Sequence, residues 1–374
     1  MKEVRQGATS GGGNGADPTT CFLGVDVGSV TTKIVASTPG GDIVASACLE
    51  TMGQPARQIM EGLADVGRQL GERERPTEER GRPAEERGEV LVLGVGTTGS
   101  GRNLAGALVG ADLIKNEITA HAVAALRLLP EARTVLEIGG QDSKVILLRD
   151  GVVVDFAMNT VCAAGTGSFL DRQAARLGLD IREFGALAAK ARHPVRIAGR
   201  CTVFAETDMV HKQQVGHPVE DIVAGLCRAL VRNYLSNLAK GKDLEPPFVF
   251  QGGVAANAGM VRAFEETLGE SVFVPPRHTL MGAYGAAILA QEAWEGADSR
   301  FRGFGLRDLD YRTSAFDCGG CANQCEIVEI FLAGAPVARW GGRCERWEGT
   351  DRASQAGRRP RPYAEAMNPV GSGT

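Results

Sequence analysis

The sequence predicts an α/β fold of two similar halves, followed by a small cysteine-rich module. Three observations predict it. Apolar strands alternate with helical patterns, a strand–glycine turn–strand unit occurs twice, and the composition changes to Gly, Arg and Cys near residue 298. With 374 residues the chain is long enough for two domains. We expect the domains to span 20–131 and 132–297, with the last helix of the second returning to the first, and the module to span 298–348.

Composition and charge exclude several classes of protein. Hydrophobic residues make up 43% and charged residues 23%, as in ordinary soluble domains. The net charge of −4 and the lack of an apolar run of about 18–20 residues predict neither a nucleic-acid partner nor a membrane partner. Residues 1–19 lack an apolar core, so we interpret them as a disordered leader; residues 349–374 are interpreted as a disordered tail. We therefore expect a cytoplasmic protein, whose nine cysteines serve more readily as metal ligands or catalytic thiols than as disulfides.

The elements follow one another in a regular order. In the first half we expect a strand–turn–strand unit at 21–38, a helix at 54–70, a charged connector at 71–89, a strand at 89–99 and a helix at 112–128. In the second half we expect a strand–turn–strand–hairpin unit at 132–159, helical patterns at 168–191 and 203–241, a strand–turn–helix unit at 246–269 and a helix at 279–296.

Three glycine turns each follow an apolar strand. They are "DVGSVTTK" (26–33), "IGGQDSK" (138–144) and "QGGVAAN" (251–257), and none matches the Walker or dinucleotide pattern. Glycine lets the backbone approach a phosphate with its N–H groups, and Ser or Thr hydroxyls add donors. Asp26 and Asp142 stand where a phosphate-bridging metal ion, or an attacking water, needs a carboxylate. Each turn alone is equally well a plain tight turn, but the three in this order predict a phosphate site.

In this order the turns resemble those of the actin-like, sugar-kinase and heat-shock ATPase superfamily. Together with "NTVCAAGTGSFLDRQA" and "CTVFAETD", the chain resembles, over roughly residues 20–297, the ATP-dependent activators of 2-hydroxyacyl-CoA dehydratases and the benzoyl-CoA reductase ATPase subunits (BadF/BadG/BcrA/BcrD type). The resemblance implies two RNase-H-like domains with ATP and Mg²⁺ in the cleft between them. It assigns catalysis to Asp26 and Asp142. It assigns nucleotide binding to Gly28, Ser29, Val30, Thr31, Thr32, Lys33, Gly139, Gly140, Gln141, Gly252 and Gly253.

Cys162 and Cys201 each precede a helix-like segment. From the residues alone they could be buried core thiols, nucleophiles or ligands of a soft metal, although neither has an obvious base beside it. The resemblance implies that each protomer contributes these two cysteines to one [4Fe–4S] cluster bridging a homodimer. The remaining apolar-pattern cysteines, Cys21, Cys48 and Cys227, are expected to pack in the core.

A second group of cysteines lies near the C-terminus. The spacing of Cys318, Cys321 and Cys325, with Cys344 returned by a hairpin at 326–342, predicts a second metal site, either Fe–S or Zn²⁺. We expect its loss to leave the ATPase core folded. The histidines at 193, 211, 217 and 278 are expected to be solvated or hydrogen-bonded, and Glu206 and Asp208 to be helix-surface charges.

The resulting expectation is an ATPase that couples ATP hydrolysis to electron transfer. The resemblance implies ferredoxin or flavodoxin as electron donor and a dehydratase or reductase component as acceptor. Two other classes stay open: a small-metabolite kinase of the same fold, which needs no iron, and an ATP-dependent scaffold, which needs neither Cys162 nor Cys201.

Overall fold

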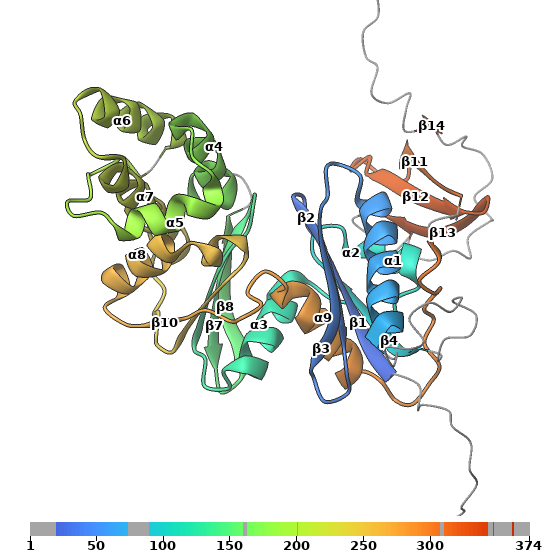
Figure 1. The fold of residues 1–374 in the computed structure, drawn as a ribbon. Coiled ribbons are helices and arrows are strands. Elements are labelled where there is room, and N and C mark those ends of the chain that lie inside the picture. The colour runs from blue at the N-terminus through green and yellow to red at the C-terminus, as the bar shows by residue number, and fades with distance from the viewer. Residues whose placement is uncertain are drawn as a thin grey trace, which may run out of the picture.

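The computed structural model describes residues 20–73, 90–159, 163–199, 201–306, 310–342, 347 and 361–362. These residues form a mixed α/β fold with two five-stranded sheets and a four-stranded C-terminal sheet. The two large sheets stand side by side, and helices α3 (Glu117–Leu128) and α9 (Met281–Glu292) lie between them (Figure 1).

The N-terminal sheet has the strand order β3-β2-β1-β4-β5. Strand β2 runs antiparallel to β1, and β4 runs parallel to it. The strand bounds are Thr20–Val27 (β1), Thr31–Ser37 (β2), Ile43–Glu50 (β3), Leu91–Thr98 (β4) and Leu113–Ile114 (β5).

The second sheet repeats this arrangement, with the order β10-β9-β6-β7-β8. Its central strand β6 pairs antiparallel with β7 and parallel with β9, as β1 pairs with β2 and β4. The two sheets therefore agree with the prediction of two similar halves. The strand bounds are Thr134–Ile138 (β6), Ser143–Arg149 (β7), Val152–Asn159 (β8), Phe248–Gln251 (β9) and Val272–Phe273 (β10).

Helices α1 (Pro55–Arg73) and α2 (Arg102–Val109) contribute to the core of the first half. Helix α1 repeats apolar residues at helical spacing, and Ile59, Leu63, Val66 and Leu70 are all buried. Helix α9 packs against β1, β2 and β4 of the N-terminal sheet and also against α3, so it joins the two halves.

The second half has a large helical layer over one side of its sheet. Its core includes Phe184, Tyr234, Phe250 and Phe264, all fully buried. The predicted helical patterns at 168–191 and 203–241 each divide into two helices at a polar or proline-containing break. The helix bounds are Gly167–Leu177 (α4), Ile181–Ala189 (α5), Thr202–Gln214 (α6), Val219–Leu238 (α7) and Ala258–Leu268 (α8).

The C-terminal sheet has the order β13-β12-β11-β14, with bounds Tyr311–Asp317 (β11), Glu326–Leu332 (β12), Ala335–Trp340 (β13) and Arg361–Pro362 (β14). The predicted hairpin is present as β12 and β13. Ile330 and Leu332 are buried in the same core as Leu108 and Val109 of α2. The C-terminal sheet thus contributes side chains to the core of the first half. Whether the ATPase core stays folded when the metal site of this module is lost remains a prediction.

The domain boundaries also stay predictions, and the leader, the tail and most of the charged connector lie outside the described residues. Among the helices of the described ranges, none combines the length and the apolar character needed to span a bilayer.

Candidate functional site

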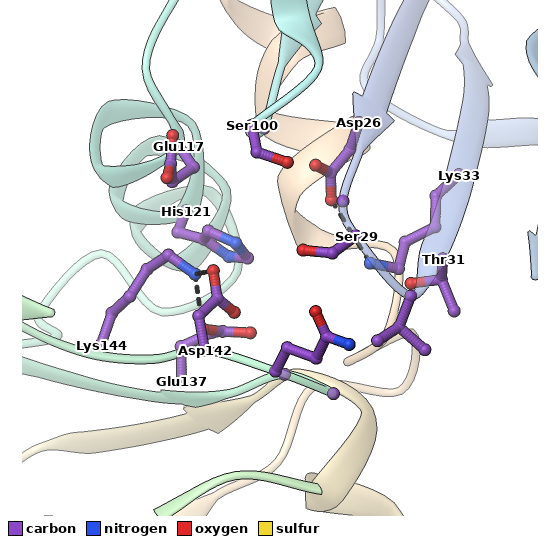
Figure 2. Close-up of a pocket in the computed structure, with 16 residues that line it drawn as sticks. Asp26, Ser29, Thr31, Lys33, Ser100, Glu117, His121, Glu137, Asp142 and Lys144 are labelled. Carbon is purple, nitrogen blue, oxygen red and sulfur yellow. Dashed lines mark hydrogen bonds and ion pairs between the residues drawn. The ribbon is translucent and has the colours of Figure 1, made fainter. Parts of the chain in front are cut away.

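A polar recess lies where the two large sheets face each other. Figure 2 shows Asp26, Ser29 and Lys33 on one side, with Glu137, Asp142 and Lys144 on the other. Loops that leave the central strands β1 and β6 supply both sides, so the recess depends on both halves of the fold.

On the first sheet, Asp26 and Lys33 are cross-strand partners of β1 and β2. Lys33 Nζ lies 3.4 Å from Asp26 Oδ2, and Asp26 is only 6% exposed. The loop between the two strands, with Gly28, Ser29 and Val30, forms the rim of the recess.

On the second sheet, Glu137 and Lys144 are the corresponding cross-strand partners of β6 and β7. Lys144 Nζ donates to Glu137 Oε2 at 3.0 Å and to Asp142 Oδ2 at 2.9 Å. Glu137 and Lys144 are buried, whereas the side chain of Asp142 is 38% exposed toward the recess.

The two pairs share a sequence signal that the pattern analysis missed. Residues 26–33 and 137–144 both read as an acidic residue, a β-branched residue, Gly, four further residues and Lys. This repeat identifies Glu137 and Lys144 as functional candidates beside the aspartates and glycines of the turns.

Asp26 and Glu137, two carboxyl groups of the recess, have pKa values shifted in opposite directions. Burial opposes ionisation of Asp26, but Lys33 and other nearby cations hold the pKa of this carboxyl below its usual value. Burial likewise opposes the charge on Lys33, yet Asp26 and Glu137 raise the pKa of its ammonium group. Asp26 and Lys33 therefore form an ionised pair at neutral pH.

Glu137 behaves differently. Burial raises the pKa of its carboxyl to about 7, although the neighbouring Lys144 favours the carboxylate. Burial also opposes the charge on Lys144, but Glu137 and Asp142 raise the pKa of its ammonium group. The carboxyl group of Glu137 therefore exchanges a proton near neutral pH.

Helix α3 supplies the third wall of the recess through Glu117 and His121. Burial and the charge of Lys144 lower the pKa of His121 to about 4, so its imidazole is neutral at pH 7. Its Nδ1 lies 2.8 Å from Nε2 of Gln251, at the end of β9. Glu117 faces Arg102 of α2 at 3.6 Å. Both residues belong to the helix predicted at 112–128; the order of the elements put Glu117 near the nucleotide side, but the sequence assigned a role in the site to neither residue.

A larger and more apolar cavity of about 370 Å³ adjoins the recess. Its walls include Gly253, Val254 and Asn257 from the third glycine turn, and Leu170 and Ile181 from α4 and α5. Asn257 Oδ1 caps α8, while its buried Nδ2 has no hydrogen-bond partner among the described residues. The cavity thus has an apolar body with a buried amide donor on its wall.

Two glycines of the turns are required by geometry. Gly252 has φ +92°, and a Cβ there would clash with the carbonyl oxygen of Ile138. A Cβ on Gly140 would lie 2.7 Å from Cγ2 of Val30 across the recess. Side chains at either position would alter the spacing of the turns.

Most of the nucleotide-site residues predicted from the sequence come together. Thr32 is an exception, because it is buried and bonds Thr51 Oγ1 at 3.0 Å instead. Gly252 is a second exception, because it lines neither the recess nor the cavity. Its N–H, within the third turn, donates to the carbonyl of His278 at 2.9 Å. Those that line the recess are Asp26, Gly28, Ser29, Val30, Thr31, Lys33, Gly139, Gly140, Gln141 and Asp142, and Gly253 lines the adjoining cavity. Their roles stay predictions.

Cys201 is the N-cap of α6 and is half-buried. Cys162 lies outside the described residues. Cys21 and Cys227 are buried, as predicted, and burial raises the pKa of each thiol to about 12. The prediction of core packing was wrong for Cys48, which is exposed and lines the 370 Å³ cavity. Its strand β3 is an edge strand whose alternate residues face the core, so Cys48 points the other way.

Cys318, Cys321 and Cys325 lie on the loop between β11 and β12. Cys318 is buried; its N–H donates to the carbonyl of Cys325 at 2.8 Å, and its Sγ accepts from Nε1 of Trp347 at 3.1 Å. Cys321 is exposed, and Cys344 lies outside the described residues. Within the ranges that the structure describes, no three His, Cys, Asp or Glu side chains are grouped closely enough to hold a metal ion.

The remaining histidine predictions are confirmed. Three of the four side chains are exposed, and Nδ1 of His278 lies 2.8 Å from the carbonyl oxygen of Gly252.

The duplicated sheets, with the carboxylate–lysine recess between them, define an α/β protein built from two similar halves. The model of the BadF/BadG/BcrA/BcrD ATPase family matches residues 23–290, and the chain belongs to this family. The expectation of an ATPase is thereby confirmed.

Similar proteins support the assignment. The chain is 35% identical to the 2-hydroxyisocaproyl-CoA dehydratase activator of Clostridioides difficile, over 72% of this chain and 94% of the activator. It is 36% identical to the (R)-2-hydroxyglutaryl-CoA dehydratase activating ATPase of Acidaminococcus fermentans, over 72% of this chain and 96% of that protein. The solved structure of the Clostridium difficile activator with bound ADPNP has a TM-score of 0.62 at 33% identity, covering 73% of this chain and 94% of that chain. The family match ends at residue 290, before the C-terminal sheet begins.

Proposed function

We propose that this protein is an ATP-driven activator that delivers low-potential electrons to a 2-hydroxyacyl-CoA dehydratase or a benzoyl-CoA reductase-type partner. The observation that carries the proposal is the duplicated carboxylate–lysine recess in a chain of this ATPase family. If the strands of each sheet are counted in chain order, both sheets have the spatial order 3-2-1-4-5. We assign each sheet to an RNase-H-like domain.

ATP binds with its phosphates in the recess and its adenosine in the 370 Å³ cavity. Lys33 and Lys144 stand on opposite sheets and supply positive charge for the phosphates. The apolar cavity, whose wall holds an Asn257 Nδ2 with no partner among the described residues, suits a nucleoside better than another phosphate group.

Mg²⁺ fits the recess because its carboxylates are hard oxygen donors and Asp26 is ionised. Asp26 and Asp142 would hold the ion, which when bound neutralises phosphate charge. Glu137 is the proposed proton acceptor for the attacking water. Its pKa near 7 suits a general base, whereas the ionised Asp26 is a poor proton acceptor.

Cys162 and Cys201 are the proposed ligands of a [4Fe–4S] cluster shared by two copies of the chain. Three observations support Cys201 in this role: it is half-buried, it precedes the first amides of α6, and the next apolar residues, Val203 and Phe204, are 67% and 68% exposed. Ala164, two residues after Cys162 in the sequence, lines the same small depression as Cys201. A second copy would cover the exposed apolar pair and complete the set of four thiolates.

When bound, the cluster would carry an electron received from ferredoxin or flavodoxin. ATP drives transfer only if it binds more tightly to the conformation that docks the dehydratase or reductase partner. Hydrolysis then returns the protein to the conformation that releases it.

A second metal site, Fe–S or Zn²⁺, is proposed at Cys318, Cys321, Cys325 and Cys344. The N–H···O bond between Cys318 and Cys325 closes the loop, and pairing of Val328 with Trp340 returns the chain to the same end of the sheet. Changing Cys318 to Ser should lower the metal content without changing ATP affinity. An unchanged metal content would exclude this site.

The test of the main proposal is anaerobic purification with iron and acid-labile sulfide analysis, followed by EPR of the reduced protein. In the Cys318→Ser variant we expect about two irons per chain from the shared cluster. Cys162→Ser should then remove this iron and favour the monomer while ATP still binds. A colourless protein that phosphorylates a small metabolite would instead indicate a kinase.

A further inference from the structure

Helix α4 begins on one of the phosphate turns. The backbone N–H of Gly167 donates to the carbonyl of Gly139 at 2.8 Å, and that of Ser168 donates to the carbonyl of Gly140 at 2.9 Å. Leu170 and Asp171, on the next turn of the helix, line the adjoining cavity. The position of α4 is therefore tied directly to the turn that lines the recess.

The other end of α4 is tied to α6. Arg176 Nη2 lies 2.6 Å from Glu206 Oε1, and Arg172 Nε lies 3.6 Å from Glu206 Oε2. The side chain of Glu206 is only 21% exposed, and both of its oxygens face α4. Figure 1 shows the two helices side by side at the outer end of the second half.

Helix α6 packs against α7. Within it only Ala205 and Met209 are buried. Asp208, which the sequence placed on the surface, accepts from the N–H of Ala198 at 2.8 Å and holds the helix to the segment before Cys201. The two arginine contacts of Glu206 are therefore a direct side-chain link between α6 and α4, in addition to the packing of α6 on α7.

We propose that Glu206 is a positioning residue that transmits the state of the nucleotide turn, through α4, to the helix that begins at Cys201. This inference deepens the proposed function and rests on it for the role of Cys201. A rigid helix of 11 residues, about 16 Å long, carries a displacement of the Gly139–Gly140 turn to its far end with little loss. Partly exposed ion pairs contribute little to stability, so orientation is the effect to measure.

Hydrogen exchange of the full-length protein, followed by mass spectrometry with ADP or ADPNP, tests the proposal. In the wild type, peptides from α6 should differ in exchange rate between the two nucleotides by about fivefold, as for a typical allosteric coupling. Glu206→Gln should abolish this difference while peptides covering 138–144 still respond. The affinity for ADPNP should change by less than about twofold.

Glu266→Gln is the matched control. Glu266 also contacts two arginines, Arg228 at 2.8 Å and Arg262 at 2.9 Å, but it joins α7 to α8 and not α4 to α6. This variant should keep the nucleotide-dependent difference in α6.

A charge-reversed variant separates coupling from local unfolding. If Glu206→Gln only frays α6, hydrogen exchange in α6 rises equally with ADP and with ADPNP. The triple variant Glu206→Arg, Arg172→Glu, Arg176→Glu reverses the charges of the ion pairs and should restore the difference in exchange between the two nucleotides. Retention of the difference in Glu206→Gln, failure of the charge-reversed variant to restore it, or its absence in the wild type would overturn the inference. Iron analysis of the same samples tests the proposed function separately, because the exchange measurement does not require a cluster.

Discussion

Asp26 and Glu137 occupy equivalent positions in the two large sheets. Each stands on a central strand and is paired with a lysine seven residues further along the chain. The two carboxyl groups differ in their pKa values. Nearby cations keep Asp26 ionised, whereas burial raises the pKa of Glu137 to about 7. Two copies of one structural unit thus provide two different carboxyl groups.

The raised pKa of Glu137 makes stability depend on pH. In the unfolded chain its pKa is about 4.5, so its contribution is fully present below pH 4.5 and is lost as the pH rises through about 7. Glu137→Gln should remove this loss. Relative to wild type, the variant should gain roughly 3 kcal/mol in free energy of unfolding between pH 4 and pH 8. Urea denaturation at both pH values measures this, with the half-buried surface residue Glu61→Gln as control; equal shifts in both variants would contradict the assignment.

ATP hydrolysis should respond to the same group. With Glu137 as proton acceptor, kcat should rise with pH through about 7, where the carboxylate forms. Glu137→Gln should lower kcat by about a hundredfold or more and leave ADPNP affinity within about threefold. Phosphate release measured from pH 5.5 to 8.5 provides the profile. A wild-type kcat in Glu137→Gln would show that Glu137 is not the proton acceptor.

Removing the charge of Lys33 should weaken nucleotide binding. Lys33→Met deletes a cation of the recess and leaves Asp26 without its 3.4 Å partner. Because a hydrogen bond to a charged group is worth about 1.5–3 kcal/mol, we expect ADPNP affinity to fall by at least about tenfold in calorimetric titrations. Lys115→Met removes an exposed charge that is not part of the recess lining, so this variant should bind normally. Equal losses in the two variants would indicate a nonspecific charge effect.

A side chain at Gly140 should obstruct the phosphate turn. In Gly140→Val the new Cβ meets Val30 at 2.7 Å, so the two turns must separate. ATP turnover should fall below about a tenth of the wild-type rate while circular dichroism remains unchanged. Gly305→Val, at an exposed position where a Cβ meets nothing within 4 Å, should retain activity. Normal hydrolysis by Gly140→Val would refute the assignment of this turn.

The C-terminal sheet should contribute to the stability of the first half. Ile330 is fully buried in the core that includes Leu108 and Val109, so Ile330→Ala should cost about 2–5 kcal/mol of unfolding free energy. Urea unfolding followed by far-ultraviolet circular dichroism measures it, and Val152→Ala, at a 62% exposed position of β8, is the control. A loss no larger than that of the control would favour an independent module.

Much of the site could be predicted because its residues follow strands in a fixed order. Asp26, Lys33 and Gly140 belong to glycine turns that could each be plain tight turns, and it is the order of the three turns along the chain that indicated a phosphate site. Glu137 and His121 could not be placed in this way. Glu137 looks like one more residue of an apolar strand, and His121 reaches the recess only because α3 packs between the sheets.

Cys48 and Glu206 show a second limit of the sequence. An apolar context predicted burial for Cys48, but whether a strand lies at a sheet edge depends on pairings with distant residues. A glutamate on a polar helix face predicts solvent contact, and only the position of α4 gives Glu206 its two arginine partners. Both outcomes depend on tertiary placement, which local periodicity does not contain.

The division of the recess between two sheets also determines how the protein should melt. One cation–carboxylate pair belongs to each half, so a nucleotide held by Lys33 and Lys144 contacts both halves at once. A ligand that binds only the assembled recess stabilises both halves together. In scanning calorimetry, two overlapping thermal transitions should therefore merge into one as ADPNP is added, and bound nucleotide would make the two lobes a single cooperative unit.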